Sequence, residues 1–117
     1  CKFYQADIDN LYSSKYDLIT SNPPYIVKNK IRNLEEDVKC FEPRLALDGG
    51  YDGISVIKLL INKSSVLLKK NGKMIIEIEN KLLFKIKKLL IKKKFYLEKI
   101  TKDLSNKNRC ITCIKLI

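Results

Sequence analysis

The chain contains no histidine, and among its four cysteines only Cys110 and Cys113 have the C-x-x-C spacing. This pair falls in a stretch of alternating apolar residues that predicts a strand, and residues three apart on a strand face opposite sides. The two sulfurs therefore cannot share a metal ion, so we expect structural cysteines and no metal site. An imidazole cannot serve as the general base in any reaction that the chain supports.

Long apolar runs are also absent, and none approaches the length needed to span a membrane. Free thiols and the lack of a signal peptide predict a reducing compartment, and hence a cytoplasmic location without membrane contact. The 117 residues suffice for one small domain with a single core, without repeats or low-complexity linkers.

The net charge of +11 comes mostly from lysine. A basic chain suggests an anionic partner, so weak contact with RNA or ribosomes through the lysines is one interpretation. A solvated, lysine-rich surface is the other. The interleaved arginines and aromatics of RNA-stacking modules are absent.

The segment Asn22-Pro23-Pro24-Tyr25 is the most informative in the chain. It follows Tyr16–Ser21, an apolar run that predicts a short buried strand. Two prolines cannot continue a sheet ladder, and Asn22, which precedes them, is restricted to an extended conformation. In open α/β sheets ligands bind at the carboxyl ends of the strands, which is where this places Asn22.

The chemistry of this segment suits a flat group that bears an NH2. The Asn22 side chain and the Pro23 carbonyl each offer an acceptor oxygen, and Tyr25 offers a planar ring. A rigid turn that ends a strand is the structural alternative.

The remaining pattern alternates strands and helices, which implies a parallel sheet with right-handed crossovers. Asp52 or Ser55 is expected to cap a helix that runs to about Lys70 and ends at Asn71-Gly72. The other expected elements are a strand buried on both faces at Lys73 to Ile78, a lysine-rich helix at Asn80 to Lys94, and strands at Phe95 to Lys102 and Arg109 to Ile117, with a turn at Asn106 to Asn108.

Before the Asn-Pro-Pro-Tyr segment, Lys2 to Ala6 predicts a short strand that ends at Asp7. Asp7 is either a cofactor-binding carboxylate or a turn or helix cap. Between this segment and the first helix, Ile26 to Cys40 predicts a surface loop that could close over a substrate. Phe41 to Gly53 is either a brace for a substrate channel or a loop, in which Gly49-Gly50 supplies backbone freedom.

Together, these motifs resemble the release factor glutamine methyltransferases of the HemK/PrmC type. Asn-Pro-Pro-Tyr alone is also similar to adenine-N6 DNA methyltransferases. The block from Phe41 to Gly50, followed by Asp52-Gly53, favours the glutamine enzymes, as do Leu68 to Lys73, Ile76 to Ile78, Lys102 to Leu104 and Asn108-Arg109. The resemblance runs from about Phe3 to the end.

The resemblance implies an α/β fold, the Rossmann-like class I methyltransferase sheet, mostly parallel with an antiparallel terminal pair. It implies methyl transfer from S-adenosylmethionine to the Gln of the Gly-Gly-Gln motif of a peptide chain release factor. Asn22 and Pro23 would be catalytic, and Pro24 and Tyr25 would also bind substrate. Asn22, Asp7 and Ile8 would lie near the cofactor.

Two family features do not occur before Asn22: the glycine-rich loop after the first strand and the acidic residue after the next one. Residues 1–117 are therefore expected to be the carboxyl-terminal part of a single catalytic domain, incomplete because the first strands are absent, and inactive alone. The family usually has Gly, and Gln three residues later, where this chain has Glu79 and Leu82.

Two other functions stay open on the sequence. One is an adenine-N6 nucleic acid methyltransferase fragment, and the other is a non-catalytic basic domain that binds RNA. The first predicts methylation of adenine, and the second predicts RNA affinity that falls steeply with salt and needs no cofactor.

Overall fold

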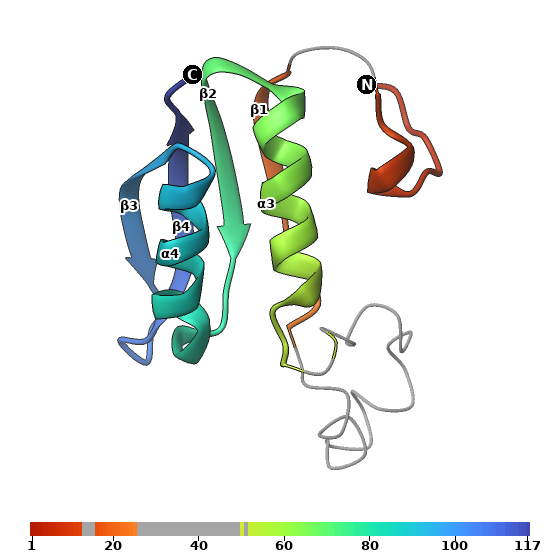
Figure 1. Cartoon of the computed structure of the whole chain (residues 1–117). Helices are drawn as coiled ribbons and strands as arrows, with labels where there is room; N and C mark the ends of the chain where they lie inside the picture. Colours follow the sequence, from red (N-terminus) through yellow and green to blue (C-terminus); the bar gives the residue numbers. More distant parts are fainter. Residues whose placement is uncertain (13–15, 26–49, 51) are drawn as a thin grey trace, which may run out of the picture.

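The computed structural model describes residues 1–12, 16–25, 50 and 52–117, and these form a four-stranded sheet with two helices (Figure 1). The strand order is β1-β2-β4-β3. The strands are β1 (Tyr16–Ser21), β2 (Leu68–Glu77), β3 (Phe95–Lys102) and β4 (Asn108–Lys115). β1 runs parallel to β2, whereas β4 is antiparallel to both β2 and β3. This confirms the predicted parallel pair with an antiparallel terminal hairpin.

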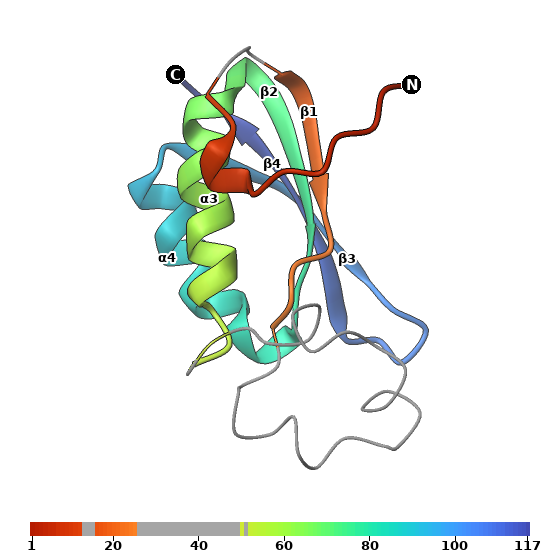
Figure 2. The same ribbon diagram turned by 90° about the vertical axis from the view of Figure 1, so that its right-hand side faces the viewer.

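Both helices, α3 (Ser55–Leu67) and α4 (Leu83–Lys92), cover the same face of the sheet (Figure 2). A short 3-10 helix, η3 (Asn80–Leu82), leads into α4. The apolar side chains of each helix recur about every 3.6 residues and therefore line one face of it. They pack against every second residue of β2 and β4, because alternate residues of a strand point to the same face. The fully buried side chains of this core include Ile57, Ile61, Met74, Ile76, Ile86, Leu90, Ile111 and Cys113.

Neither Asp52 nor Ser55 is the N-cap of α3 as predicted, because Ile54 holds that position without a side-chain cap, but Asp52 contacts the start of the helix. The Asp52 carboxylate accepts hydrogen bonds from the Ile54 N–H (3.2 Å) and the Ser55 hydroxyl (3.3 Å). These bonds hold the pKa of Asp52 below its usual value, with the Ile54 bond the largest cause. Gly50 has φ +87°, in line with the backbone freedom expected of the paired glycines.

The opposite face of the sheet carries no helix within the described ranges (Figure 2). The expectation that the strand at Lys73 to Ile78 is buried on both faces was therefore wrong for this part of the chain: Lys73 is exposed while Met74 is buried. β1 was also expected to be buried, yet Leu18 is 52% exposed. β1 forms an edge of the described sheet, which leaves its outer side without a partner strand there.

Asn71-Gly72 does not end the first helix as predicted, because α3 stops at Leu67 and the chain passes directly into β2. Asn71 has φ +64°, and the pairing with β1 changes register here, from Tyr16 opposite Leu68 to Leu18 opposite Lys73. Asn71 and Gly72 therefore form an irregularity within β2. A Cβ on Gly72 would lie 2.9 Å from the carbonyl oxygen of Lys69 and 3.1 Å from that of Tyr16.

The predicted strand at Lys2 to Ala6 does not form, since this segment has no regular structure and Phe3 is 91% exposed. A strand needs a neighbour to satisfy its backbone, and none of the described strands pairs with it. Asp7 instead caps a 3-10 helix, η1 (Ile8–Asn10), by accepting a hydrogen bond from the Asp9 N–H (2.9 Å).

The turn between β3 and β4 is organised by Asp103. Its Oδ1 accepts hydrogen bonds from the backbone N–H groups of Ser105 (2.9 Å) and Lys107 (3.0 Å). Its Oδ2 accepts two from the Arg109 guanidinium, from Nε (3.2 Å) and Nη2 (2.8 Å). The bond from Lys107, followed by those from Arg109, lowers the pKa of the Asp103 carboxyl. The turn lies at Leu104 to Asn106, slightly earlier than the predicted Asn106 to Asn108, because Asn108 already belongs to β4; Asn106 has φ +60° within it.

Cys110 and Cys113 lie on opposite faces of β4, as their spacing predicts. Cys113 is buried against the helices, whereas Cys110 is half-buried on the other face. Burial raises the pKa of Cys113 to about 12, so this thiol stays protonated near neutral pH. In the part of the chain that the structure describes, no helix is long and apolar enough to cross a membrane.

Replacing Gly72 with alanine tests the close approach of β1 and β2. We expect the G72A variant to lose about 1–3 kcal/mol of unfolding free energy, because the added methyl meets two backbone oxygens that cannot rotate away. Urea unfolding followed by circular dichroism measures this loss, with exposed Lys70→Ala as the neighbouring control. A G72A loss no larger than that of the control would show that the strands do not approach so closely.

The Asp103 turn predicts a pH dependence of stability. Because the folded pKa of Asp103 is below the unfolded value of about 3.8, its stabilisation is present above that value. This contribution is lost as the pH falls through the folded pKa. Unfolding free energies measured between pH 6 and pH 2 should therefore fall less steeply in Asp103→Asn than in the parent chain. Parallel curves for the two proteins would contradict the assignment.

Candidate functional site

Asn22 to Tyr25 lies at the carboxyl ends of the two parallel strands. Ser21, the last residue of β1, pairs with Ile76 of β2, so the chain leaves β1 beside Glu77 at the end of β2. Asn22 is exposed, Pro23 is buried, and Pro24 and Tyr25 are half-buried. The structure thus places Asn22 at the expected edge of the sheet, with its side chain open to solvent. We call Asn22–Tyr25 together with Glu77 and Arg109 the carboxyl rim.

Tyr25 connects this segment to β2. Its hydroxyl donates a hydrogen bond to Oε1 of Glu77, with 3.3 Å between the oxygens. Partial burial, followed by the negative charge of Glu77, raises the pKa of Tyr25, so the phenol is the protonated donor near neutral pH. The ring also packs against the hydrophobic core. Tyr25 therefore fixes the position of the prolines and, through them, of Asn22.

Arg109, at the start of β4, supplies the positive charge next to this pair. Its guanidinium binds Asp103, and its positive charge also attracts the negative charge of Glu77. Its backbone carbonyl accepts a hydrogen bond from the Ile78 N–H (2.8 Å), which fixes β4 beside the end of β2. The rim is therefore tied to the terminal hairpin as well as to β2.

The rim can position a planar group without supplying a strong base. The exposed Asn22 side chain offers an acceptor and a donor, while the buried Pro23 fixes the backbone that carries it. The charges of Glu77 and Arg109 are engaged with Tyr25 and Asp103. Such a site acts by orientation and by stabilising charge, because its titratable groups are occupied by structural contacts.

The other predicted site residues, Asp7 and Ile8, are not brought to the rim. η1 lies beside the second half of α3, where Lys63 donates a hydrogen bond to the Asp9 carbonyl (2.8 Å) (Figure 2). Ile8 packs against the core and Asp7 caps η1, which matches the structural interpretation of Asp7. Their proximity to a cofactor stays a prediction.

Several sequence predictions lie outside the described residues. These are the loop at Ile26 to Cys40 and most of the block from Phe41 to Gly53, including the expected pairing of Glu42 with Arg44. Of the two departures from the family pattern, Glu79 is half-buried and pairs with Lys81 (3.5 Å). Leu82 is buried in the core, where a glutamine would need hydrogen-bond partners.

Sequence reasoning gave no role to Glu77 or Arg109, although both lie within the matched motifs. Glu77 stood out as a carboxylate within the apolar strand pattern Met74 to Ile78, and a charge in such a position needs a partner. The partner, Tyr25, is 52 residues away, so no local pattern could have identified it.

Comparison with known proteins identifies relatives along most of the chain. The release factor glutamine methyltransferase of Clostridium acetobutylicum is 32% identical over 101 residues, which are 86% of this chain and 35% of that protein. The ribosomal protein uL3 glutamine methyltransferase of Francisella tularensis is 39% identical over 72 residues, which are 62% of this chain and 23% of that protein. No protein-family model matches the chain.

A methyltransferase from Pyrococcus furiosus has a similar structure, with a TM-score of 0.61 and 21% sequence identity over 91% of this chain and 44% of that chain. At this identity the likeness shows the fold, which is that of a methyltransferase. The chain spans about a third or less of the length of the curated relatives named above. The chain is therefore related to the release factor glutamine methyltransferases along most of its own length.

Proposed function

We propose that the carboxyl rim holds the side-chain amide of a glutamine for methylation on nitrogen. The methyl donor would be S-adenosylmethionine, and the substrate would be the Gln of the Gly-Gly-Gln motif of a peptide chain release factor. The observation that supports this is the position of Asn22, which is exposed at the shared carboxyl end of β1 and β2. The name of the Clostridium relative supports the choice of glutamine.

The rim's task follows from the chemistry of an amide. An amide nitrogen is a poor nucleophile, because its lone pair is delocalised into the carbonyl group. The Asn22 Oδ1 and the Pro23 carbonyl would accept the two N–H bonds and so hold the nitrogen in line with the methyl group. The same two oxygens would stabilise the positive charge that develops on nitrogen. Tyr25, anchored by Glu77, would pack against the amide plane.

S-adenosylmethionine, when bound, supplies an electrophilic methyl group on a sulfonium. The amide nitrogen would bond to this methyl group while the electron pair of the broken S–C bond stayed on sulfur, and the nitrogen would lose one proton to solvent. Asn22 is the rim residue that fits a role beside both reactants, because its side chain is open at the edge where ligands bind. A cytoplasmic location and contact of the lysines with ribosomes stay predictions.

A second substrate is the glutamine of a ribosomal protein, which the Francisella relative's name supports. A chimera tests both, with this chain replacing the matched 101 residues of the Clostridium enzyme. We expect transfer of labelled methyl groups to one of the two proteins. Methylation of adenine-containing DNA, with neither protein modified, would favour the nucleic acid reaction and contradict the proposal.

Within an active chimera, Asn22→Ala should lower kcat by roughly 100-fold or more, since a lost transition-state contact costs about 3 kcal/mol. The dissociation constant for S-adenosylhomocysteine, measured by calorimetry, should change little. Asn10→Ala is the matched control, because Asn10 is exposed in η1. Parent-like turnover in Asn22→Ala would remove Asn22 from the mechanism.

Tyr25 and Glu77 should act as one unit. We expect Tyr25→Phe and Glu77→Ala each to lower kcat by about three- to tenfold, because the lost hydrogen bond is worth roughly 1 kcal/mol. The double variant should lose little more than either single one, which is the result of a shared contact. Exposed Tyr96→Phe is the control. Fully additive losses would show that the two side chains act independently.

A further inference from the structure

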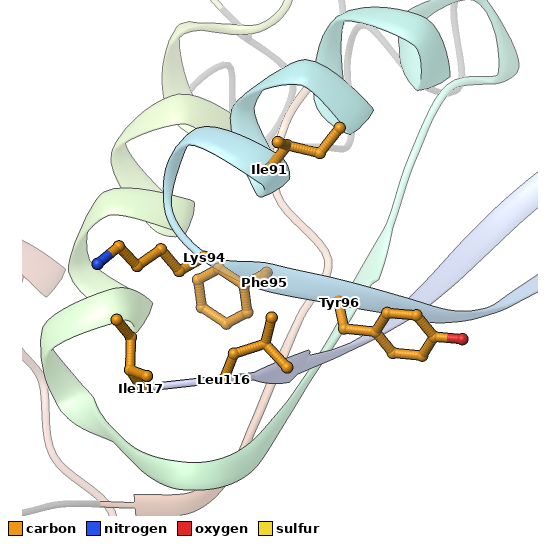
Figure 3. A pocket seen from close by; sticks show the side chains of 6 residues that line it. All are labelled: Ile91, Lys94, Phe95, Tyr96, Leu116 and Ile117. Atoms are coloured by element: carbon orange, nitrogen blue, oxygen red, sulfur yellow. The ribbon is translucent and has the colours of Figure 1, made fainter.

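An apolar hollow lies at the opposite end of the sheet from the carboxyl rim, where α4, the start of β3 and the segment after β4 meet (Figure 3). It has a volume of about 400 Å³ and is lined by Ile91, Lys94, Phe95, Tyr96, Leu116 and Ile117. A second hollow of about 220 Å³ is lined by Lys87, Leu90, Ile91, Phe95 and Leu97. The two hollows are neighbours, since Ile91 and Phe95 line both, and we call them together the β3 groove.

Backbone hydrogen bonds fix the floor of this groove. The Leu116 N–H donates to the carbonyl of Lys94 (3.0 Å), and the Lys94 N–H donates to that of Ile91 (3.0 Å). Lys94 closes the helix with φ +60°, and Phe95 is 4% exposed beneath it. The groove therefore exists before any partner binds, which reduces the entropy cost of binding.

The walls of the groove expose apolar side chains to water. Ile91 is 75% exposed, Tyr96 is 58% exposed and Ile117 is 61% exposed. Single exposed apolar residues are common, but a contiguous set around a hollow marks an interaction site. Burial of these three side chains would contribute to the affinity for an apolar partner.

The charge around the groove is of one sign. No acidic residue occurs from Asn80 to Leu97, a span that contains seven lysines: Lys81, Lys85, Lys87, Lys88, Lys92, Lys93 and Lys94. Of these, the five from Lys87 onward form no ion pair with any described residue. The two charged residues that line the groove, Lys87 and Lys94, are thus both cations, while its floor is apolar.

We infer that the β3 groove is a docking site for an acidic polypeptide segment with apolar side chains. Its apolar side chains would fill the two hollows, and its carboxylates would pair with Lys87, Lys94 and the neighbouring lysines. Charge complementarity of this kind raises the association rate and selects the partner, while the apolar contacts hold it.

The other possible occupants fit less well. A second copy of this chain would place like charges together, since each copy carries a net charge of +11. RNA needs flat stacking partners and arginine, but the lining of the groove has no arginine and Tyr96 is its only exposed ring. A flat membrane surface could not contact all of the recessed apolar floor of the groove.

The groove and the rim lie at opposite ends of β4, because Arg109 is near the start of this strand and Leu116 follows its end. A partner bound in the β3 groove would therefore leave the carboxyl rim free. The groove would recruit a protein to this chain without occupying its candidate methylation site.

The test uses the whole chain and a fluorescein-labelled 12-residue peptide composed of Leu and Glu. Two counterparts replace Glu with Gln or Leu with Ser. Fluorescence anisotropy should show binding of the Leu/Glu peptide, and at least tenfold weaker binding of both counterparts. Ile91→Ser should weaken binding at least tenfold, whereas Val66→Ser should not, although Val66 on α3 is 72% exposed. Lys87→Glu should weaken binding more than Lys58→Glu, which changes an exposed lysine of α3.

Circular dichroism of each variant shows whether it is folded, and both Ser substitutions lie at exposed positions. No binding of the Leu/Glu peptide would overturn the inference, as would equal losses in Ile91→Ser and Val66→Ser. Poly(U) RNA and phosphatidylserine vesicles are the remaining arms. If either bound the chain and lost this binding in Ile91→Ser, while the peptide did not, the groove would have a different occupant.

Discussion

The parallel pairing of β1 with β2 is the constraint on which the candidate site depends. Ser21 lies opposite Ile76, and both strands end within a residue or two of that pair. The chain therefore leaves β1 at the point where β2 presents Glu77. The two prolines then prevent the strand from continuing, and Asn22 is left exposed at its end. A shift of β1 by one residue would turn every side chain of the strand to the other face.

Tyr25 makes this geometry rigid by contacts on two sides. Its ring packs against the edge of the hydrophobic core, and its hydroxyl donates a hydrogen bond to Glu77 at the end of β2. Arg109 and Asp103 extend the arrangement into the β3–β4 turn. A proline-rich segment at the edge of a sheet would otherwise have few backbone hydrogen bonds to hold it. The side-chain contacts supply that support, and they leave the acceptors of the Asn22 side chain facing solvent.

The local sequence pattern was sufficient to predict the helices, which form their own backbone hydrogen bonds, and the two strands of the short terminal hairpin. The apolar periods of α3 and α4 and the alternation of β3 and β4 predicted these elements within a few residues. Lys2 to Ala6 was also predicted to be a strand, but no described strand lies beside it to satisfy its backbone hydrogen bonds. Asn71-Gly72 has the composition of a helix end, and only the approach of the Tyr16 carbonyl shows why glycine is needed within β2.

The same limit applies to the site. Asn22 and its prolines could be placed from sequence, because proline restricts its own neighbours. Glu77 could not be connected with Tyr25, since a side-chain contact across 52 residues depends on the register of two strands. The exposed face of the sheet could not be anticipated either, because the apolar residues of β2 fit a strand covered on one face or on both.

The central claim is that Asn22 and Pro23 together hold a glutamine amide by its two hydrogens. A crystal structure of the active chimera with S-adenosylhomocysteine and a Gly-Gly-Gln peptide tests it most directly. The account predicts that the glutamine side-chain nitrogen lies about 3 Å from both the Asn22 Oδ1 and the Pro23 carbonyl oxygen. A glutamine bound elsewhere, with the Asn22 side chain turned away to solvent, would contradict it.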